Sequence, residues 1–559
     1  MKYLKFLTVV LFAYQKFLKI NLTVFTNALF YDIILIKQGG LLRYSKTNVK
    51  QQGEGFDMIK ATKKILDEID NLATKRKAEI LNSPDTVEIS GSTYYVSANG
   101  NDENDGKTPE SAWKTLAKVS SFPLEKGDGV RFKRGDTFRG FVNTRPGVTY
   151  AAYGSGKKPE LLSWDKNLAN ESLWSLYDGE RNIWKLSETI LDCGTLVFNG
   201  GEKHSRKLIP SYIGGKFVCR DDETKLFDVS AEMTENLDIF CRYEAVLTTR
   251  ESKGETFPIP EMNENSFGDL YLRCDEGNPG KVFDSIEAVT RRSMFYVRNN
   301  ENVHIDNICI KYVGIHSVAA GGKSVVGLKV TNCEIGWGGG TVQHYLGTDP
   351  NYPQGGRGTV TRFGNGVEIY GGCDDYEVSN CYIYQIYDAG MTHQITTFGN
   401  KYEMKNVRYK NNLVENCVYS IEYFLEKNCK DTESFMDGIE ISGNILRFSG
   451  YGWGQQRHNT DTPAHIKGWS YENTAKNYCV HDNIFDRAAY RMLHLVAKKD
   501  ESCPKMYGNT YVQTLGGRIG QYGGNEKEEP ENLVFDENAE EKIKKVFGEE
   551  NPTVYFVEK

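Results

Sequence analysis

The chain has 559 residues and a net charge of −7, with 75 acidic against 68 basic side chains. Because both signs are mixed along the chain, the sequence has no basic footprint of the kind that binds nucleic acid. Its 55 glycines, 33 tyrosines and 27 phenylalanines favour turn-rich β structure, and its length suits several domains or one solenoid.

The 12 cysteines are scattered singly, without a C-x-x-C pair. In a long chain this pattern indicates buried free thiols and a reducing compartment rather than a disulfide framework. We therefore expect a cytoplasmic protein, with secretion as the alternative.

Residues 1–57 fit neither a signal peptide nor a membrane anchor. The apolar run 7–14 follows two lysines, but two more lysines come next and no small-residue cleavage site follows. No run reaches the roughly 20 apolar residues of a spanning helix, so we expect no membrane partner. Residues 58–90 are predicted to form a helix and a linker, because apolar residues recur there at helical spacing until Pro84. We interpret residues 1–57 as an atypical N-terminal extension, with a functional start near Met58.

The segment 91–159 carries recognisable motifs. Residues 93–97 read Thr-Tyr-Tyr-Val-Ser, an Asn/Asp/Gly-rich loop follows, and Pro109 precedes Trp113-Lys-Thr-Leu. These motifs, with the Gly- and Phe-containing strands of 127–138, resemble the start of right-handed parallel β-helix proteins of the pectate-lyase-like superfamily. The resemblance implies an all-β solenoid and a carbohydrate-active protein. The resemblance is specific for the fold and unspecific for the reaction, because that superfamily includes lyases, hydrolases and proteins of unknown activity.

Residues 160–290 break the pattern and are predicted to be a β-rich insertion. Trp164, Trp174 and Trp184 are expected in the core of this module, with a sugar-stacking role as the alternative. Residues 526–559 are predicted to form a tail with a short helix and a final strand that caps the last coil.

Residues 291–525 repeat one short phrase, in which an Asn precedes an apolar pair and an alternating strand. It occurs at Asn307, Asn332, Asn380, Asn412, Asn444, Asn483 and Asn509. Recurrence of this kind predicts a repeat architecture, and the period-two alternation predicts strands. An Asn at an equivalent bend of each coil tolerates left-handed backbone angles, and its amide can bond the next Asn in a ladder. These residues are therefore expected to form the β-helix coils.

Three carboxylates are the candidate catalytic residues. If Val367, Met391 and Ile421 face the coil interior together with Ile519, the residues that follow the first three face outward on one sheet. This register places Glu368 and Glu422 two rungs apart, roughly 9.6 Å between backbones, which suits the spacing of an acid and a base in inverting glycoside hydrolysis. Asp388 lies at a turn one rung from Glu368, so a Glu368/Asp388 pair is equally open. The alternative for each carboxylate is that it is solvated and idle.

Substrate-binding residues are expected around this face. The candidates are His316, Arg362, Thr392, His393, Gln394, Tyr423, Trp453 and His458. Strict alternation turns His393 inward, so its role in binding requires a bulge after Gly390. Loops 338–358 and 452–468 are expected to form the two walls of a cleft.

No metal or cofactor is predicted, and calcium is the one ion left open. His458, Asp461 and His465 lack zinc-ligand spacing. We also expect no outward Lys or Arg beside Glu368, and no Asp triplet on successive coils.

These observations predict an enzyme that cleaves glycosidic bonds of an oligosaccharide or polysaccharide, as a hydrolase with paired carboxylates. A polysaccharide lyase is the enzymatic alternative. A non-catalytic β-helix that binds glycan or acts as a spacer is the alternative from another class.

Overall fold

Parallel strands stacked in successive coils make up most of the chain. The structure is a computed structural model that describes residues 59–558, except 214–215, 244–245, 253–254, 262–265, 299–300, 346–359, 398, 428–432, 458–462 and 527. The N-terminal extension and much of the 338–358 loop therefore lie outside the described residues, as do His458 and Asp461. Among the described residues, no helix is both long and apolar enough to cross a membrane.

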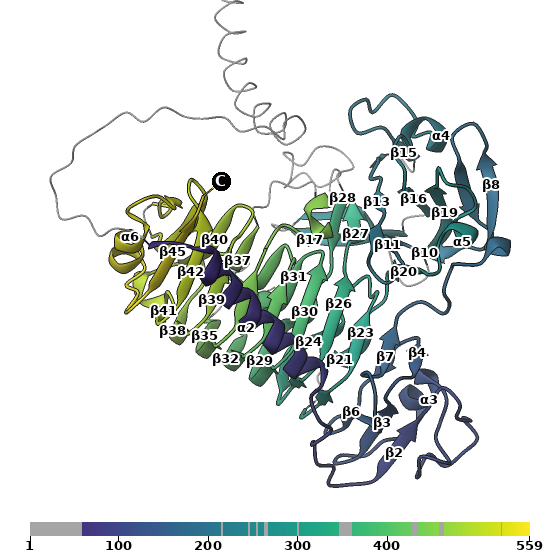
Figure 1. The fold of residues 1–559 in the computed structure, drawn as a ribbon, viewed down its shortest axis with the longest axis horizontal. Helices are drawn as coiled ribbons and strands as arrows, with labels where there is room; N and C mark the ends of the chain where they lie inside the picture. The colour runs from purple at the N-terminus through teal and green to yellow at the C-terminus, as the bar shows by residue number, and fades with distance from the viewer. Residues whose placement is uncertain are drawn as a thin grey trace, which may run out of the picture. The chain divides into compact units, whose positions relative to one another are not determined.

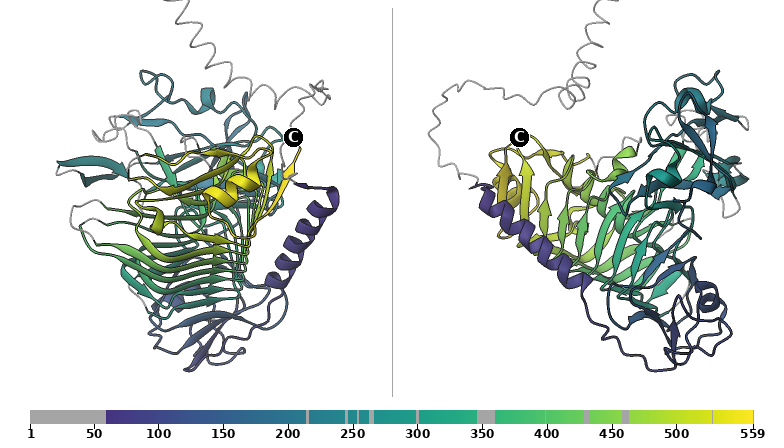
Figure 2. Two further views of the ribbon diagram at one scale, coloured as in Figure 1. Left: turned by 90° about the vertical axis from the view of Figure 1, so that its left-hand side faces the viewer. Right: turned by 45° about the vertical axis from the view of Figure 1, so that its right-hand side comes forward.

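Each coil contributes a strand to three rows, and every neighbouring pair within a row is parallel (Figure 1; Figure 2, left). The first row contains β5 (Val142–Asn143), β21 (Phe295–Arg298), β24 (Val318–Val326), β29 (Val367–Ser379), β31 (Ala389–Thr396), β34 (Tyr419–Glu426), β37 (Ala464–Gly468), β40 (Arg491–Ala497) and β43 (Arg518–Gly524). The second contains β2 (Thr93–Val96), β3 (Gly129–Lys133), β6 (Thr149–Tyr153), β22 (His304–Asp306), β25 (Lys329–Thr331), β32 (Glu403–Lys410), β35 (Phe435–Ser442), β38 (Ala475–His481) and β41 (Lys505–Tyr507). Strands β24 and β29 bend and run on into the second row.

The third row closes each coil. It contains β4 (Thr137–Arg139), β7 (Glu160–Leu162), β23 (Cys309–Lys311), β26 (Glu334–Gly338), β30 (Tyr382–Ile386), β33 (Leu413–Glu415), β36 (Ile445–Arg447), β39 (Ile484–Asp486), β42 (Thr510–Thr514), β45 (Thr553–Val557) and β1 (Ile59–Lys60). One continuous apolar core fills the coils from Val96 to Val554. Val367, Met391 and Ile421 are adjacent in register and fully buried, so the predicted inward stack is confirmed. Ile519 is buried in the same core, but Gly520 occupies the position in register with this stack.

The recurring asparagines occupy two neighbouring positions rather than one. Asn307, Asn332 and Asn380 have left-handed backbone angles, with φ between 51° and 62°. In later coils Asn411, Gly443, Asp482 and Gly508 occupy this bend, and the predicted ladder is formed one residue on. There each side-chain amide donates to the next Oδ1 over 2.9–3.0 Å, in the order Asn412, Asn444, Asn483 and Asn509. We call these four residues the Asn ladder. The expectation that all seven share one register is therefore wrong, because bending and stacking use different residues.

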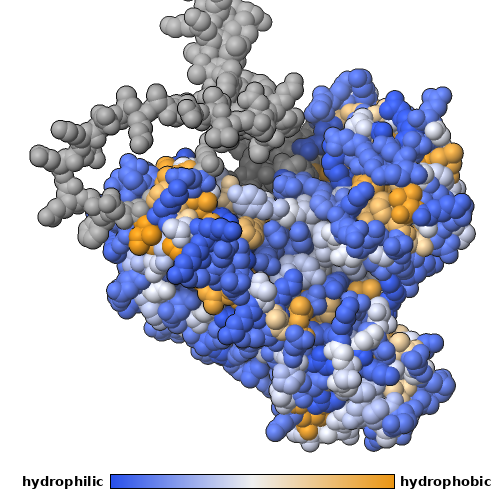
Figure 3. Space-filling model, viewed as in Figure 1, coloured by the Kyte–Doolittle hydropathy of each residue, from blue (hydrophilic) through white to orange (hydrophobic). Residues whose placement is uncertain are grey.

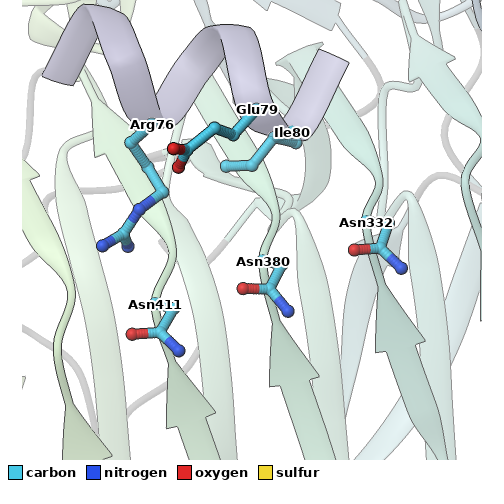
Figure 4. Close-up of a pocket in the computed structure, with 6 residues that line it drawn as sticks. All are labelled: Arg76, Glu79, Ile80, Asn332, Asn380 and Asn411. Carbon is cyan, nitrogen blue, oxygen red and sulfur yellow. The ribbon is translucent and has the colours of Figure 1, made fainter. Parts of the chain in front are cut away.

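Helix α2 (Lys63–Leu81) runs across the third row from the last coil toward the first (Figure 1). Strand β1 pairs with β45, and Ala73 and Ile80 of α2 pack on Tyr382, Leu413 and Ile445. Below the helix lies a groove of about 390 Å³, in which Asn332, Asn380 and Asn411 are aligned (Figure 4). The outer surface on this side is largely hydrophilic (Figure 3).

Both ends of the β-helix are covered. At one end, α3 (Leu116–Ser121) and Trp113 close the first coils, and at the other, α6 (Ala539–Val546) inserts Ala539 and Ile543 into the core. The fold class predicted from the sequence is confirmed: a right-handed parallel β-helix with an N-terminal helix and a β-rich insertion.

The insertion leaves the β-helix after β7 and returns before β21. Its helices are α4 (Val229–Glu232) and α5 (Pro279–Val282), and its strands are β8 (Trp174–Asp178), β9 (Ile183–Leu186), β10 (Ile190–Leu191), β11 (Cys193–Phe198), β12 (Lys203–His204), β13 (Arg206–Lys207), β14 (Ser211–Ile213), β15 (Lys216–Val218), β16 (Asp238–Tyr243), β17 (Val246–Ser252), β18 (Glu255–Glu261), β19 (Phe267–Arg273) and β20 (Ile286–Thr290). Strands β17 and β18 form one antiparallel sheet with β27 (Thr341–Tyr345) and β28 (Val360–Phe363), so the insertion and the 338–358 loop build one structure. Trp164 and Trp174 lie in the core of this module, and Trp184 packs against it.

Candidate active site

The outward residues of the first row change from coil to coil. Parallel register aligns Glu368, Thr392, Glu422, Lys467 and His494 on five successive coils. We call these residues the outer row. Because neighbouring coils repeat at about 4.8 Å, the row extends roughly 19 Å along the solenoid.

A cleft of about 900 Å³ runs beside the outer row. One wall comes from β27 and β28, where Gln343, Thr361 and Phe363 face the cleft, and Arg457 belongs to the opposite loop. The expectation that the two long loops flank the cleft therefore agrees with the described parts of both loops.

Glu368 is a buried carboxyl in this cleft, and its pKa is raised. It is 8% exposed, and burial raises its pKa to about 8, with the charges of Asp388 and Glu422 adding to the effect. The side chain of Asn365 opposes the shift by donating a hydrogen bond to Oε2. Glu368 is therefore mostly protonated at neutral pH and can act as an acid.

His316 faces Glu368 as a neutral imidazole. Its Nδ1 accepts a hydrogen bond from the Asn365 backbone N–H over 3.0 Å and lies 3.1 Å from Oε2 of Glu368. Burial and the nearby charge of Arg291 lower the pKa of His316 to about 3. A neutral Nδ1 favours the protonated form of Glu368, because an ionised carboxylate would meet the lone pair of the imidazole.

Asn365 fixes the orientation of Glu368, and the sequence analysis missed it. Its Oδ1 accepts from the N–H of Ala389 over 2.8 Å, so Nδ2 must point the other way, toward Glu368. The available signal was an Asn between two glycines, Gly364 and Gly366, directly before the outward strand.

The other two candidate carboxylates each have a basic neighbour. Asp388, in the turn before β31, forms an ion pair with Arg457 at 2.5 Å. Glu422 forms one with Lys467 at 3.4 Å. Both carboxylates are largely buried and each is ion-paired, so the cleft combines a buried carboxyl of raised pKa with two ion-paired carboxylates.

Lys467 corrects the expectation that no outward Lys or Arg lies near Glu368. It follows Glu422 on the outer row, its Nζ donates a hydrogen bond to the Tyr419 hydroxyl over 3.0 Å, and Nζ lies 4.2 Å from the centre of that ring. Residues 452–468 are predicted from the sequence to form a loop, whereas 464–468 form the next strand of the first row.

Two predicted binding residues lie on the outward face beside Glu368. Thr392 is in register between Glu368 and Glu422, and no hydrogen-bond partner for its Oγ1 is present among the described residues. Gln394 lines the cleft, and its Nε2 lies 3.4 Å from Oε2 of Glu368.

His393 and Tyr423 do not face the cleft. Strict alternation holds without a bulge, so both point into the coil, where their rings stack with centroids 5.3 Å apart. Nδ1 of His393 contacts the Tyr409 hydroxyl at 3.1 Å, and burial lowers the pKa of His393 to about 3. Both are core residues, and the prediction that they bind substrate is wrong.

Arg362 and Trp453 support the cleft walls from behind. Nε and Nη2 of Arg362 donate to the carbonyls of Gly340 and Gly194 over 2.7 and 3.0 Å, and its guanidinium lies 4.3 Å from the Tyr387 ring centre. Trp453 is 1% exposed, and its indole N–H donates to a backbone carbonyl. A direct binding role for Trp453 is therefore wrong, whereas Arg362 retains a position on the cleft wall.

Aromatic side chains lie beside the outer row, two residues farther along the strands. Tyr370, Phe424 and Trp469 line the cleft, with ring centroids 6.2 Å apart between the first two and 4.3 Å between the last two. We call these three residues the aromatic strip. Sequence analysis overlooked it because the strands that carry it are separated by loops of different lengths.

Within the described residues, no group of three or more His, Cys, Asp or Glu side chains is arranged to hold a metal ion. His465 is buried against Ser449 instead, with 2.9 Å between Nδ1 and Oγ. The described cysteines are all free, and only Cys219 and Cys479 are not fully buried.

No protein-family model and no curated protein matches this sequence significantly. Among solved structures, similar chains are "The complex structure of XylC with xylose" (12% identity, TM-score 0.39, 83% of this chain and 82% of that one) and a "Glycoside hydrolase" (10%, 0.38, 84% and 96%). The GH136 lacto-N-biosidase from Eubacterium ramulus (11%, 0.35, 88% and 70%) and the pectate lyase Pel9A (11%, 0.33, 78% and 71%) are also similar. Scores this low carry no information on reaction or substrate. The parallel coils themselves identify the fold of this chain as a parallel β-helix.

Proposed function

We propose that the protein hydrolyses glycosidic bonds of an oligosaccharide or polysaccharide, with Glu368 as general acid and Glu422 as general base. The observation that carries this proposal is the placement of two unlike carboxyls two coils apart on the outer row. Glu368 is buried, which raises its pKa to about 8, whereas Glu422 is ion-paired with Lys467.

The spacing of the two carboxyls favours inversion at the anomeric carbon. Glu368 and Glu422 are two rungs apart, so their backbones are separated by roughly 9.6 Å, next to the 6.5–9.5 Å range of carboxyl separations in inverting enzymes. In this scheme Glu368 donates its proton to the departing glycosidic oxygen. Glu422 takes a proton from the water that attacks the opposite face of the sugar. Thr392 lies between them, at the position where that water would be held.

Asp388 is assigned a different role. Its charge contributes more than that of Glu422 to the raised pKa of Glu368, so it helps to keep the acid protonated. The ion pair with Arg457 keeps this charge in place.

A glycan-panel digestion with chromatographic product analysis tests the reaction, and NMR of the fresh product tests its anomeric configuration. We expect saturated reducing ends of inverted configuration. Glu368→Gln and Glu422→Gln should each lower turnover by about 10²-fold or more with folding intact, because each removes one proton transfer. Glu403→Gln, in the second row, is the matched control and should leave turnover unchanged. Normal turnover in both site variants would contradict the proposal.

A lyase is the second candidate, because Lys467 is a basic side chain on the outer row. Elimination requires a neutral amine as base, but the nearby Glu422 carboxylate favours the charged ammonium. Ultraviolet-absorbing unsaturated products in the same digestion would identify a lyase.

A further inference from the structure

The charged groups of the cleft are largely matched within the protein. Arg457 faces Asp388, and Lys467 faces Glu422. Arg491 donates to Oε1 of Gln521 over 2.7 Å, and Gln521 in turn donates to Glu529 over 2.9 Å. These cations already have acceptors within the protein, so an anionic ligand would compete with those partners.

His494 offers a neutral contact at the end of the outer row. It is 6% exposed, and neither ring nitrogen has a hydrogen-bond partner among the described residues. Burial and the charges of Arg491 and Lys467 lower the pKa of His494 to about 2, so the ring carries one N–H donor and one acceptor nitrogen. Both nitrogens are shielded from solvent here, so a ligand reaches them after rotation of the ring.

A sugar hydroxyl suits this ring better than a carboxylate or a sulfate does. A hydroxyl both donates and accepts, so either nitrogen can be satisfied. A carboxylate only accepts, so it can satisfy the N–H nitrogen but not the acceptor nitrogen. Thr392, whose Oγ1 also lacks a described partner, has the same preference for a group that can donate or accept.

The aromatic strip adds an apolar surface next to these polar groups. Tyr370 and Trp469 are half-buried, and Phe424 packs between them. Aromatic faces bury the C–H faces of pyranose rings without requiring charge. The strip crosses the same coils as the outer row, so a chain lying along the cleft contacts both.

We propose that the cleft binds a neutral saccharide chain rather than a uronate or sulfated one, with sugar rings on Phe424 and Trp469 and hydroxyls bonded to His494. This inference rests on the proposed function and specifies its substrate class. It also bears on the reaction, because β-elimination removes a proton adjacent to a carboxyl group, which a neutral sugar lacks.

Binding is measured separately from cleavage, so that the two proposals can fail separately. The full chain carrying Glu368→Gln is titrated calorimetrically with neutral gluco-, xylo-, manno-, galacto- and N-acetylated oligosaccharides, and with oligogalacturonates and sulfated oligosaccharides of equal length. We expect at least one neutral series to bind ten-fold or more tightly than every acidic one. Tighter binding of an acidic series, or no binding by any neutral series, would overturn the inference. Neutral binding without cleavage by the unmodified protein would support it and refute the proposed function.

Variants assign the contacts. Trp469→Ala and His494→Ala should each weaken neutral binding about ten-fold, and Trp469→Phe should retain most of it. Tyr451→Ala, an exposed aromatic outside the cleft, is the control. Thermal unfolding of each variant confirms folding, and His494→Gln replaces His494→Ala if the latter unfolds. Unchanged affinity in folded Trp469 and His494 variants would contradict the assigned contacts.

Discussion

The Asn ladder and the outer row belong to the same coils but follow opposite rules. In the ladder asparagine recurs at each of four coils, where the first three amides each donate to the next Asn Oδ1 and Asn509 donates to Glu549. In the outer row neighbouring coils always carry different residues, and four residue types (Glu, Thr, Lys and His) occur over five coils.

The difference shows where stability and chemistry lie in a solenoid. When identical amides stack, the hydrogen-bonding groups of each side chain are satisfied by the neighbouring coil. A residue repeated in this way therefore indicates a structural role. Catalysis needs an acid, a base and contacts of different kinds along one line, and these require unlike residues. Buried charges in the cleft cost folding free energy unless they are paired, which explains the basic partners of Asp388 and Glu422.

The coil interior should be the most sensitive region. Met391→Asp places an unpaired carboxyl among fully buried apolar residues and should cost about 4 kcal/mol or more of the free energy of unfolding. Thr392→Val, at the next residue, faces outward and should cost far less. Urea unfolding measures both, and equal losses would show that the two faces are not distinct.

The Asn ladder should come next. Asn444→Ala removes an acceptor for Asn412 and a donor to Asn483 and to the carbonyl of Tyr409, so several buried groups lose their partners. We expect a loss of about 2–3 kcal/mol in the free energy of unfolding. Catalytic turnover should stay near normal, and a large loss of turnover in a folded variant would contradict the separation of the two regions.

The Asn at the bend should matter less. Asn380 is exposed and has φ 51°, so Asn380→Ala should cost about 1 kcal/mol through backbone strain. Asn380→Gly relieves that strain and is the matched control. If Asn380→Ala cost as much as Asn444→Ala, the two positions would share one role after all.

The sequence predicted the fold because its signals are local. Period-two alternation can be recognised within a single strand, and the recurring Asn residues lie at or next to the same bend in several coils. The alternation placed Glu368, Thr392 and Glu422 on one face correctly. Pairing between coils is not local, since loops of different length separate the strands. The sequence therefore did not predict that Lys467 pairs with Glu422 or that Arg457 pairs with Asp388. The prediction that His393 binds substrate failed for another reason. The bulge that it required is absent, so strand alternation turns the side chain inward.

The smallest expected effect is a shift in the pH dependence of the acid. Glu368 must be protonated to act, and its pKa is raised to about 8, so activity should fall as pH rises through that value. Asp388→Asn removes a negative charge that favours the protonated form, so the pKa of Glu368 should fall and the decline should begin at lower pH. The pH profile of kcat/KM measures this shift, and NMR titration of the Glu368 carboxyl measures it without substrate. Asp375→Asn, on the second row, should leave the profile in place. An unchanged pH profile in Asp388→Asn would mean that burial alone raises the pKa of Glu368, and that Asp388 serves only to hold Arg457.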